Sequence, residues 1–216
     1  MSSPVPISMM KSDPFIYLKD NDLSAEFCRH VIDKFESEPS ERRRPGTVGY
    51  NRRQDEKMKK SYDLWLQSYI DEWREEDTTF FEHLTSNLRC YTEHIKSINP
   101  VMHYFTSEDI VKDTGYQIQK YIKSEGGHYD WHHDFMVKKE LGPRMLTYIW
   151  YLNDVEDGGH TEFVNGVKVE PKAGRLCIFP ATWTYLHRGC TPISNDKYIV
   201  TGWVYCGNDY QKTQLV

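Results

Sequence analysis

The second half of the chain consists of short segments rich in Tyr, Ile, Val, Trp and Thr, and clusters of Gly, Asn, Asp and Pro separate them. Such segments are typical of β-strands joined by turns. The expected strands are residues 115–123, 144–152, 160–169, 174–179 and 197–205, and residues 128–134 form a further strand or strand end. Many short strands in succession predict a sandwich or barrel for this part of the chain.

The first half carries helical patterns. Ser24 can cap a helix that runs to about Glu36, and a longer helix is predicted over residues 78–97. Apolar residues at helical spacing are Phe27, Val31 and Phe35 in the first helix and Phe81, Leu84, Leu88, Tyr91 and Ile95 in the second. Helices followed by strands predict an α+β fold in which the helices pack on the β-core.

A long loop rich in Pro, Gly, Ser and charge is predicted between the two helices, over residues 38–60. Residues 42–60 contain eight Lys and Arg against two Asp and Glu, a local charge of +6. We interpret this stretch as a solvated, mobile loop, and the alternative is a site for an acidic partner. Extended to residue 66, the segment 38–66 is long enough to close over a substrate as a mobile lid.

Composition narrows the class of protein. The 216 residues are 38% hydrophobic, which suits a single domain over residues 1–216. A net charge of -5 argues against nucleic-acid binding, and no apolar run is long enough for a membrane span. Residues 1–14 lack the pattern of a secretory signal, so a cytoplasmic location is expected. Five scattered cysteines without a CxxC pair argue against disulfides and against a thiolate zinc site.

Metal ligands are suggested by His132 and Asp134, which lie two residues apart and so point to the same side of a strand. His187, just after a later strand, would complete a set of two histidines and one carboxylate. That set suits non-haem Fe(II), because it leaves coordination positions open for dioxygen chemistry. His128 with Asp130 is a competing pair, and His132 could also be a core or surface histidine.

Lys197, ten residues after His187, shares a strand face with Thr201 and Trp203. An ammonium group inside a sheet is costly unless an anion meets it, and the far carboxylate of 2-oxoglutarate would be such an anion. Gln119 and Tyr121 also share one face of their strand, so these mixed faces could line a polar pocket. The alternatives are a solvated face and a lysine at a strand edge that reaches water.

Residues 116–205 resemble the prolyl 4-hydroxylase-type branch of the 2-oxoglutarate/Fe(II) oxygenases. The matching pieces, in order, are Gly-Gly-His-Tyr-Asp-Trp-His-His-Asp (126–134), Tyr-Ile-Trp-Tyr-Leu-Asn-Asp (148–154), Gly-Gly-His-Thr-Glu-Phe (158–163), Gly-Arg-Leu-Cys-Ile-Phe-Pro (174–180), His-Arg-Gly-Cys-Thr-Pro (187–192) and Lys-Tyr-Ile-Val-Thr-Gly-Trp (197–203). The resemblance implies a double-stranded β-helix, a jelly-roll or cupin-like core buttressed by N-terminal helices.

The resemblance also assigns roles to individual residues. The iron ligands it implies are His132, Asp134 and His187, and the cosubstrate residues are Lys197, Tyr151, Tyr121 and Thr201. Tyr121 would replace a tyrosine that many members carry two positions later, where this chain has Lys123. The residues expected to contact substrate are Arg144, Tyr129, Trp131 and Trp203.

The activity implied by the resemblance is an O2-dependent hydroxylation that uses Fe(II) and 2-oxoglutarate, with ascorbate as an accessory, and releases succinate and CO2. Because Asp134 is retained, hydroxylation is expected and halogenation is not. The expected substrate is proline in a peptide or protein. The alternatives are hydroxylation of a free amino acid or other small metabolite, and a metal-binding jelly-roll module without turnover. The sequence leaves the oligomeric state open.

Overall fold

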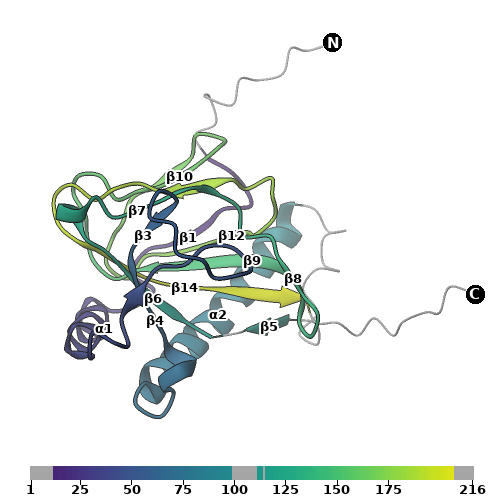
Figure 1. The fold of residues 1–216 in the computed structure, drawn as a ribbon. Helices are drawn as coiled ribbons and strands as arrows, with labels where there is room; N and C mark the ends of the chain where they lie inside the picture. Colours follow the sequence, from purple (N-terminus) through teal and green to yellow (C-terminus); the bar gives the residue numbers. More distant parts are fainter. Residues whose placement is uncertain (1–11, 99–110, 114, 207–216) are drawn as a thin grey trace, which may run out of the picture.

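The fold is built from two antiparallel sheets and two α-helices in the computed structural model, which describes residues 12–98, 111–113 and 115–206 (Figure 1). The larger sheet has the order β1 (Tyr17–Lys19), β12 (Leu176–Pro180), β9 (Gly142–Tyr151), β14 (Lys197–Cys206), β6 (Gln117–Tyr121), β4 (Tyr62–Trp65) and β2 (Arg44–Pro45). In addition, β5 (Val111–Asp113) pairs with β14, and β8 (Val137–Lys138) pairs with β9. The smaller sheet has the order β11 (Lys168–Val169), β10 (Thr161–Phe163), β13 (His187–Gly189), β7 (His128–His132) and β3 (Lys59–Lys60).

The inner faces of the two sheets pack against each other. Phe163 of the smaller sheet and Phe179 of the larger sheet meet edge to face, with ring centroids 4.9 Å apart. Ile149 and Ile199 of the larger sheet belong to the same buried cluster. This arrangement agrees with the predicted double-stranded β-helix, and each predicted strand segment overlaps an observed strand. Residues 160–169 form two strands, β10 and β11, joined by a turn.

Helix α1 (Ala25–Ser37) begins where the sequence predicts, because the Ser24 hydroxyl accepts a hydrogen bond of 3.1 Å from the backbone N–H of Phe27. Helix α2 (Arg74–Ile98) begins four residues before its predicted start. Its first turn carries three acidic residues, which the positive end of the helix dipole stabilises. The two short 3-10 turns of the described chain are η2 (Leu66–Tyr69) and η4 (Lys123–Glu125).

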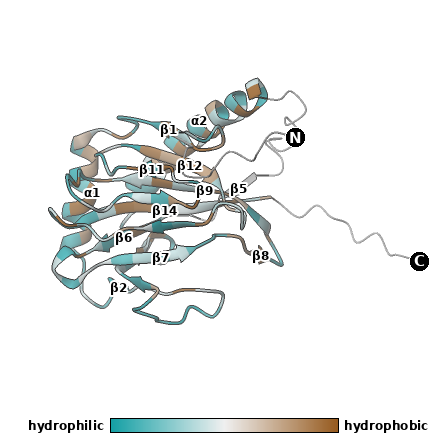
Figure 2. Ribbon diagram, turned by 90° about the horizontal axis from the view of Figure 1, so that it is seen from above, coloured by the Kyte–Doolittle hydropathy of each residue, from teal (hydrophilic) through white to brown (hydrophobic). Residues whose placement is uncertain are grey.

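Both helices lie on the face of the larger sheet that is turned away from the smaller sheet (Figure 1). The Phe80 ring packs 5.6 Å from Trp150, and Phe81 is 54% exposed. Phe81, the first member of the apolar stripe predicted for this helix, therefore does not reach the core. The face of α2 that meets the sheet carries Phe80, Leu84, Tyr91 and Ile95. Figure 2 shows hydrophilic and hydrophobic residues alternating around both helices, as in amphipathic helices.

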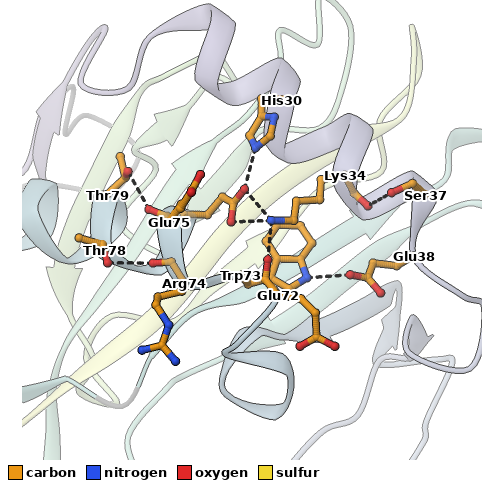
Figure 3. A network of polar contacts seen from close by, with 11 residues as sticks. His30, Lys34, Ser37, Glu38, Glu72, Trp73, Arg74, Glu75, Thr78 and Thr79 are labelled. Atoms are coloured by element: carbon orange, nitrogen blue, oxygen red, sulfur yellow. Dashed lines mark hydrogen bonds and ion pairs between the residues drawn. The ribbon is translucent and has the colours of Figure 1, made fainter.

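Polar contacts hold α1 against the start of α2 (Figure 3). The Trp73 indole donates a hydrogen bond of 2.8 Å to Glu38, and Lys34 donates one of 2.7 Å to the carbonyl of Glu72. The buried carboxylate of Glu76 accepts from Lys34 at 2.8 Å and lies 2.6 Å from His30. These contacts fix the helix pair as one unit on the outer face of the sheet.

The segment 38–66 is not an irregular loop throughout. Residues 59–66 form β3, β4 and the start of η2, and the side chains of Leu64 and Leu66 are fully buried. The expectation of a loop up to residue 60 is therefore wrong at this end, because residues 59–60 form β3. The lid over residues 38–66 stays a prediction, and its last residues, Leu64 and Leu66, join the main core. Residues 46–58, between β2 and β3, remain outside named strands. Their mobility stays a prediction.

Several cations of the basic stretch are paired with carboxylates. Arg42 lies 3.2 Å from Glu38, and Arg43 lies 2.8 Å from Glu36 on α1. Lys59 forms a buried ion pair, described below. The excess positive charge of residues 42–60 is therefore partly neutralised within the fold.

Within the described part of the chain, no helix combines the length and the apolar character that crossing a bilayer would need.

Candidate metal centre and cosubstrate pocket

Two neighbouring strands bring the predicted ligands together. His132 at the end of β7 and His187 at the start of β13 are paired in register, and their ring centroids lie 4.2 Å apart. Asp134 follows β7, and one of its carboxylate oxygens lies 3.6 Å from Nε2 of His187. One ligand atom from each of the three residues lies within 4.8 Å of the other two. The structure thus gathers the three residues around a single point.

Backbone carbonyls fix the tautomer of both histidines. Nδ1 of His132 lies 2.7 Å from the carbonyl oxygen of Asp130, and Nδ1 of His187 lies 2.9 Å from that of Tyr185. A carbonyl only accepts hydrogen bonds, so each Nδ1 carries the proton and each Nε2 keeps a free lone pair. Burial, and secondly the neighbouring His187, lower the pKa of His132 to about 3. Its imidazole is therefore neutral, as metal binding requires.

Asp134 supplies the negative charge of the group and is 9% exposed. Burial alone would raise its pKa, but the pKa is lowered by His187, His132 and Arg144 and by a hydrogen bond from Thr147. The Thr147 hydroxyl donates that bond at 2.8 Å to one carboxylate oxygen. Two imidazoles that each offer Nε2 and one ionised carboxylate fit Fe(II), because they leave positions open on the metal.

Thr147 gives a first prediction. Thr147→Val keeps the shape of the side chain but removes the hydrogen bond that orients Asp134. We expect Fe(II) affinity to fall by about 10- to 100-fold, which is the usual effect of losing a partner of a metal ligand. Thr147→Ser, which keeps the hydroxyl, serves as the control. Equal Fe(II) dissociation constants for the two variants, measured anaerobically by calorimetry, would show that this bond has no part in metal binding.

A cavity opens beside the three ligands, between the two sheets. Its lining residues are Gln119, Tyr121, Tyr129, His132, Asp134, Thr147, Ile149, Thr161, His187, Gly189, Lys197, Ile199, Thr201 and Trp203. Lys197 is 2% exposed, and its ammonium donates a hydrogen bond of 2.9 Å to the carbonyl of Gly159. Among residues 12–98, 111–113 and 115–206, no carboxylate forms an ion pair with it. Burial accordingly lowers the pKa of Lys197 to about 8. An anionic ligand in this cavity would supply the missing counter-charge.

A chain of buried hydrogen bonds determines what Tyr121 offers to a ligand. Lys59 and Asp63 form an ion pair of 2.6 Å, so the carboxylate must accept the 2.9 Å hydrogen bond from the Gln117 amide. The Gln117 oxygen then accepts from Gln119 at 2.7 Å, and the Gln119 oxygen accepts the Tyr121 hydroxyl proton at 2.5 Å. Tyr121 therefore lines the cavity with an oxygen whose proton is already donated to Gln119, so that a lone pair remains to accept a hydrogen bond.

The other predicted cosubstrate and substrate residues divide into two groups. Tyr129, Thr201 and Trp203 line the cavity, and the Tyr129 ring stacks on His132 with centroids 3.5 Å apart. The predicted residues outside the cavity wall are Tyr151, Arg144 and Trp131.

Tyr151 and Arg144 each contact a residue that lines the cavity, whereas Trp131 contacts Arg188, which does not line it. The Tyr151 hydroxyl lies 2.6 Å from that of Thr161, which does line the cavity. The Arg144 guanidinium stacks 3.7 Å from the Trp203 ring centroid. Trp131 is 38% exposed and points to the outer face, where Arg188 lies over its ring.

Sequence reasoning did not select Thr147 or Thr161 as site residues, although both line the cavity, whereas it placed Gln119 on a strand face that could line a polar pocket. Strand alternation could have found the first of them, because Thr147 shares a parity with Tyr151 on β9. The competing pair, His128 with Asp130, does not form a site. Both ring nitrogens of His128 face backbone carbonyls, at 2.8 and 3.1 Å.

Comparisons with known proteins agree with this geometry. Residues 116–205 match the model of the 2OG-Fe(II) oxygenase superfamily. The probable prolyl 4-hydroxylase 3 of Arabidopsis thaliana is 31% identical over 129 residues, which are 45% of this chain and 45% of that protein. The match thus spans less than half the length of that relative. Prolyl 4-hydroxylase 13 of Arabidopsis thaliana is 24% identical over 94% of this chain and 75% of its own length.

Two solved structures share the fold. A prolyl hydroxylase from Trichoplax adhaerens, in complex with a peptide fragment of the hypoxia inducible factor oxygen degradation domain, aligns with a TM-score of 0.64, 17% identity and coverage of 90% of this chain and 84% of that one. The viral collagen prolyl hydroxylase of Paramecium Bursaria Chlorella virus-1 aligns with a TM-score of 0.56, 18% identity and coverage of 89% and 96%. The match of residues 116–205 to the superfamily model, the ligand group and the buried Lys197 together identify this stretch as a domain of the 2OG-Fe(II) oxygenase superfamily, similar to prolyl 4-hydroxylases.

Proposed function

We propose that the protein is a 2-oxoglutarate- and O2-dependent hydroxylase that acts on proline in a peptide or protein. The observation that carries this proposal is the buried Lys197 ammonium, which faces the same cavity as the three ligands without a carboxylate partner among the described residues. A group that binds one end of a dicarboxylate, beside a centre for Fe(II), is what the reaction needs. Fe(II) with 2-oxoglutarate supplies the oxidation of the substrate by dioxygen, with release of succinate and CO2.

The residues of the chain would bind and orient the reactants. Nε2 of His132, Nε2 of His187 and the Asp134 carboxylate would hold the iron. Lys197 would bind the C5 carboxylate of 2-oxoglutarate, and the Thr161 and Thr201 side chains line the same cavity. Ile149 and Ile199 are buried and line the cavity, so they would exclude water from the part of it that borders the core.

An exposed aromatic pair beside the centre favours a peptide over a small metabolite. Phe135 follows Asp134, Trp183 precedes His187, and their rings meet edge to face with centroids 5.5 Å apart. They are 37% and 62% exposed. Exposed aromatic rings of this kind are suited to packing against the apolar ring of proline and its neighbours in an extended peptide. In this proposal residues 46–58 form the lid, and α1 and α2 buttress the larger sheet as a rigid support.

Mass spectrometry of proline-containing peptides tests the proposal. The protein is incubated with Fe(II), 2-oxoglutarate, ascorbate and O2, and both succinate and the addition of one oxygen atom to each peptide are measured. Hydroxylated proline with matching succinate is the expected result. Turnover of free amino acids with inert peptides would favour the metabolite alternative. Absence of turnover with every substrate, together with no spectral change when 2-oxoglutarate is added to the Fe(II) protein, would favour the non-catalytic module.

The pH dependence of cosubstrate binding gives a second prediction. The pKa of Lys197 is lowered to about 8, so its charge is present below that pH and is lost as the pH rises through it. We expect 2-oxoglutarate affinity to fall above pH 8, by up to ~10-fold per pH unit. Lys197→Arg stays charged throughout and should remove this dependence. Calorimetric titration of the Fe(II) protein without oxygen measures both curves, and parallel curves would exclude Lys197 as the titrating group.

A further inference from the structure

A second group of metal-binding side chains lies on the outer face of the smaller sheet. Thr161 and Gly189 are paired in register and both line the cavity. Because side chains alternate along strands, their neighbours Glu162 and Cys190 project from the opposite face. His160 joins them there, and its carbonyl accepts a hydrogen bond of 2.9 Å from the backbone N–H of Cys190. The two strands thus hold an imidazole, a carboxylate and a thiol side by side.

We propose that His160, Glu162 and Cys190 form a second metal site, for a divalent cation of borderline softness such as Zn²⁺. One ligand atom from each residue lies within 4.8 Å of the other two, and all three side chains are half-buried, so a cation can reach them. Nitrogen, oxygen and sulfur ligands are the ones that Zn²⁺ prefers. The site differs chemically from the iron centre, because it contains sulfur. It also goes beyond the proposed function, which needs one metal only.

Arg188 is the internal competitor for this site. Its guanidinium donates to one oxygen of Glu162 at 2.5 Å and lies 4.8 Å from the Trp131 ring centroid. A cation bound by Glu162 would displace the guanidinium, which would keep its contact with Trp131. Lys168, 3.6 Å from Glu162, is 51% exposed and can turn toward water. Positive neighbours weaken the site, and removing Arg188 should therefore strengthen it.

Titration of the full-length protein with Co²⁺ tests the proposal, because thiolate ligands give Co²⁺ an intense near-ultraviolet charge-transfer band and a site of two histidines and one aspartate does not. We expect two equivalents of Co²⁺ to bind, one of them with the sulfur band. Zn²⁺ should abolish the band by displacing Co²⁺. Cys190→Ala should lack the band and still bind one equivalent, which also shows that it is folded. Cys90→Ala, in which an exposed cysteine of α2 is removed, should keep the band.

Arg188→Ala tests whether Glu162 is a ligand, because the variant removes the guanidinium that competes with the metal for this carboxylate. We expect Co²⁺ to bind the sulfur site roughly two- to fivefold more tightly, the range that corresponds to removing a competing, partly exposed ion pair. A wild-type protein without the band, a band that survives in Cys190→Ala, or weaker binding in Arg188→Ala would each overturn the proposal. Because the readout is a spectrum and involves no turnover, it is independent of the hydroxylase activity.

Discussion

Asp134→Ala is expected to abolish hydroxylation, with turnover lowered by more than ~100-fold, since loss of a mere partner of a metal ligand already costs 10- to 100-fold. Asp134 is the only anionic member of the candidate centre, and the histidines alone leave the charge of Fe(II) uncompensated. Its removal also takes away the acceptor of the Thr147 hydroxyl. Succinate release with a peptide substrate and the Fe(II) content of the purified variant are the two measurements.

Asp130→Ala is the matched control for this prediction. Asp130 lies on the same segment and is exposed, and its backbone carbonyl, which orients His132, is kept in the variant. It should bind Fe(II) and turn over nearly as the unchanged protein does. If Asp134→Ala kept full iron content and activity, or if Asp130→Ala lost both, the ligand assignment would have to be abandoned.

Lys197→Met is expected to have opposite effects on cosubstrate binding and on stability. Without the ammonium, the KM for 2-oxoglutarate should rise by ~100-fold or more, since breaking a buried charge pair costs about 3 to 5 kcal/mol. In the protein without cosubstrate, a buried cation lacking an ion-pair partner among the described residues is replaced by an apolar side chain of similar length. The free energy of unfolding should therefore rise by roughly 1 to 3 kcal/mol. Steady-state kinetics and chemical denaturation measure the two effects.

Lys120→Met separates this effect from the general loss of a lysine. Lys120 lies on β6, opposite Tyr198 of β14, and pairs with Glu36 at 2.7 Å. Its removal breaks an existing ion pair, so stability should fall slightly and the KM for 2-oxoglutarate should not change. A Lys197→Met protein that is less stable than the unchanged protein would mean that the ammonium is better solvated than its burial indicates. A Lys197→Met protein with an unchanged KM would refute its role in cosubstrate binding.

The sequence by itself determined the features that depend on local periodicity. His132 and Asp134 share one side of their segment because a strand repeats every two residues. For the same reason Lys197, Thr201 and Trp203 all reach the cavity from β14. The start of α1 was equally predictable, since the bond from Phe27 to the Ser24 cap spans only three residues.

Features that depend on how distant segments meet were decided by the tertiary structure alone. Whether Phe80 or Phe81 is buried depends on which side of α2 faces the sheet. Phe80 is the buried one, because its ring packs against Trp150 of the sheet. Residues 59–60 and 62–65 become strands only because β7 and β6 offer free edges to pair with.

The clusters of polar side chains also could not be predicted from the sequence alone. The direction of the hydrogen bonds that end at Tyr121 is imposed by Lys59 and Asp63, more than fifty residues earlier in the chain. His160 and Cys190 are thirty residues apart, and no spacing rule joins them. Only the register between β10 and β13 does so. Side-chain alternation is a property of each strand, whereas register is a property of a pair of strands, and it is settled by the packing of the whole sheet.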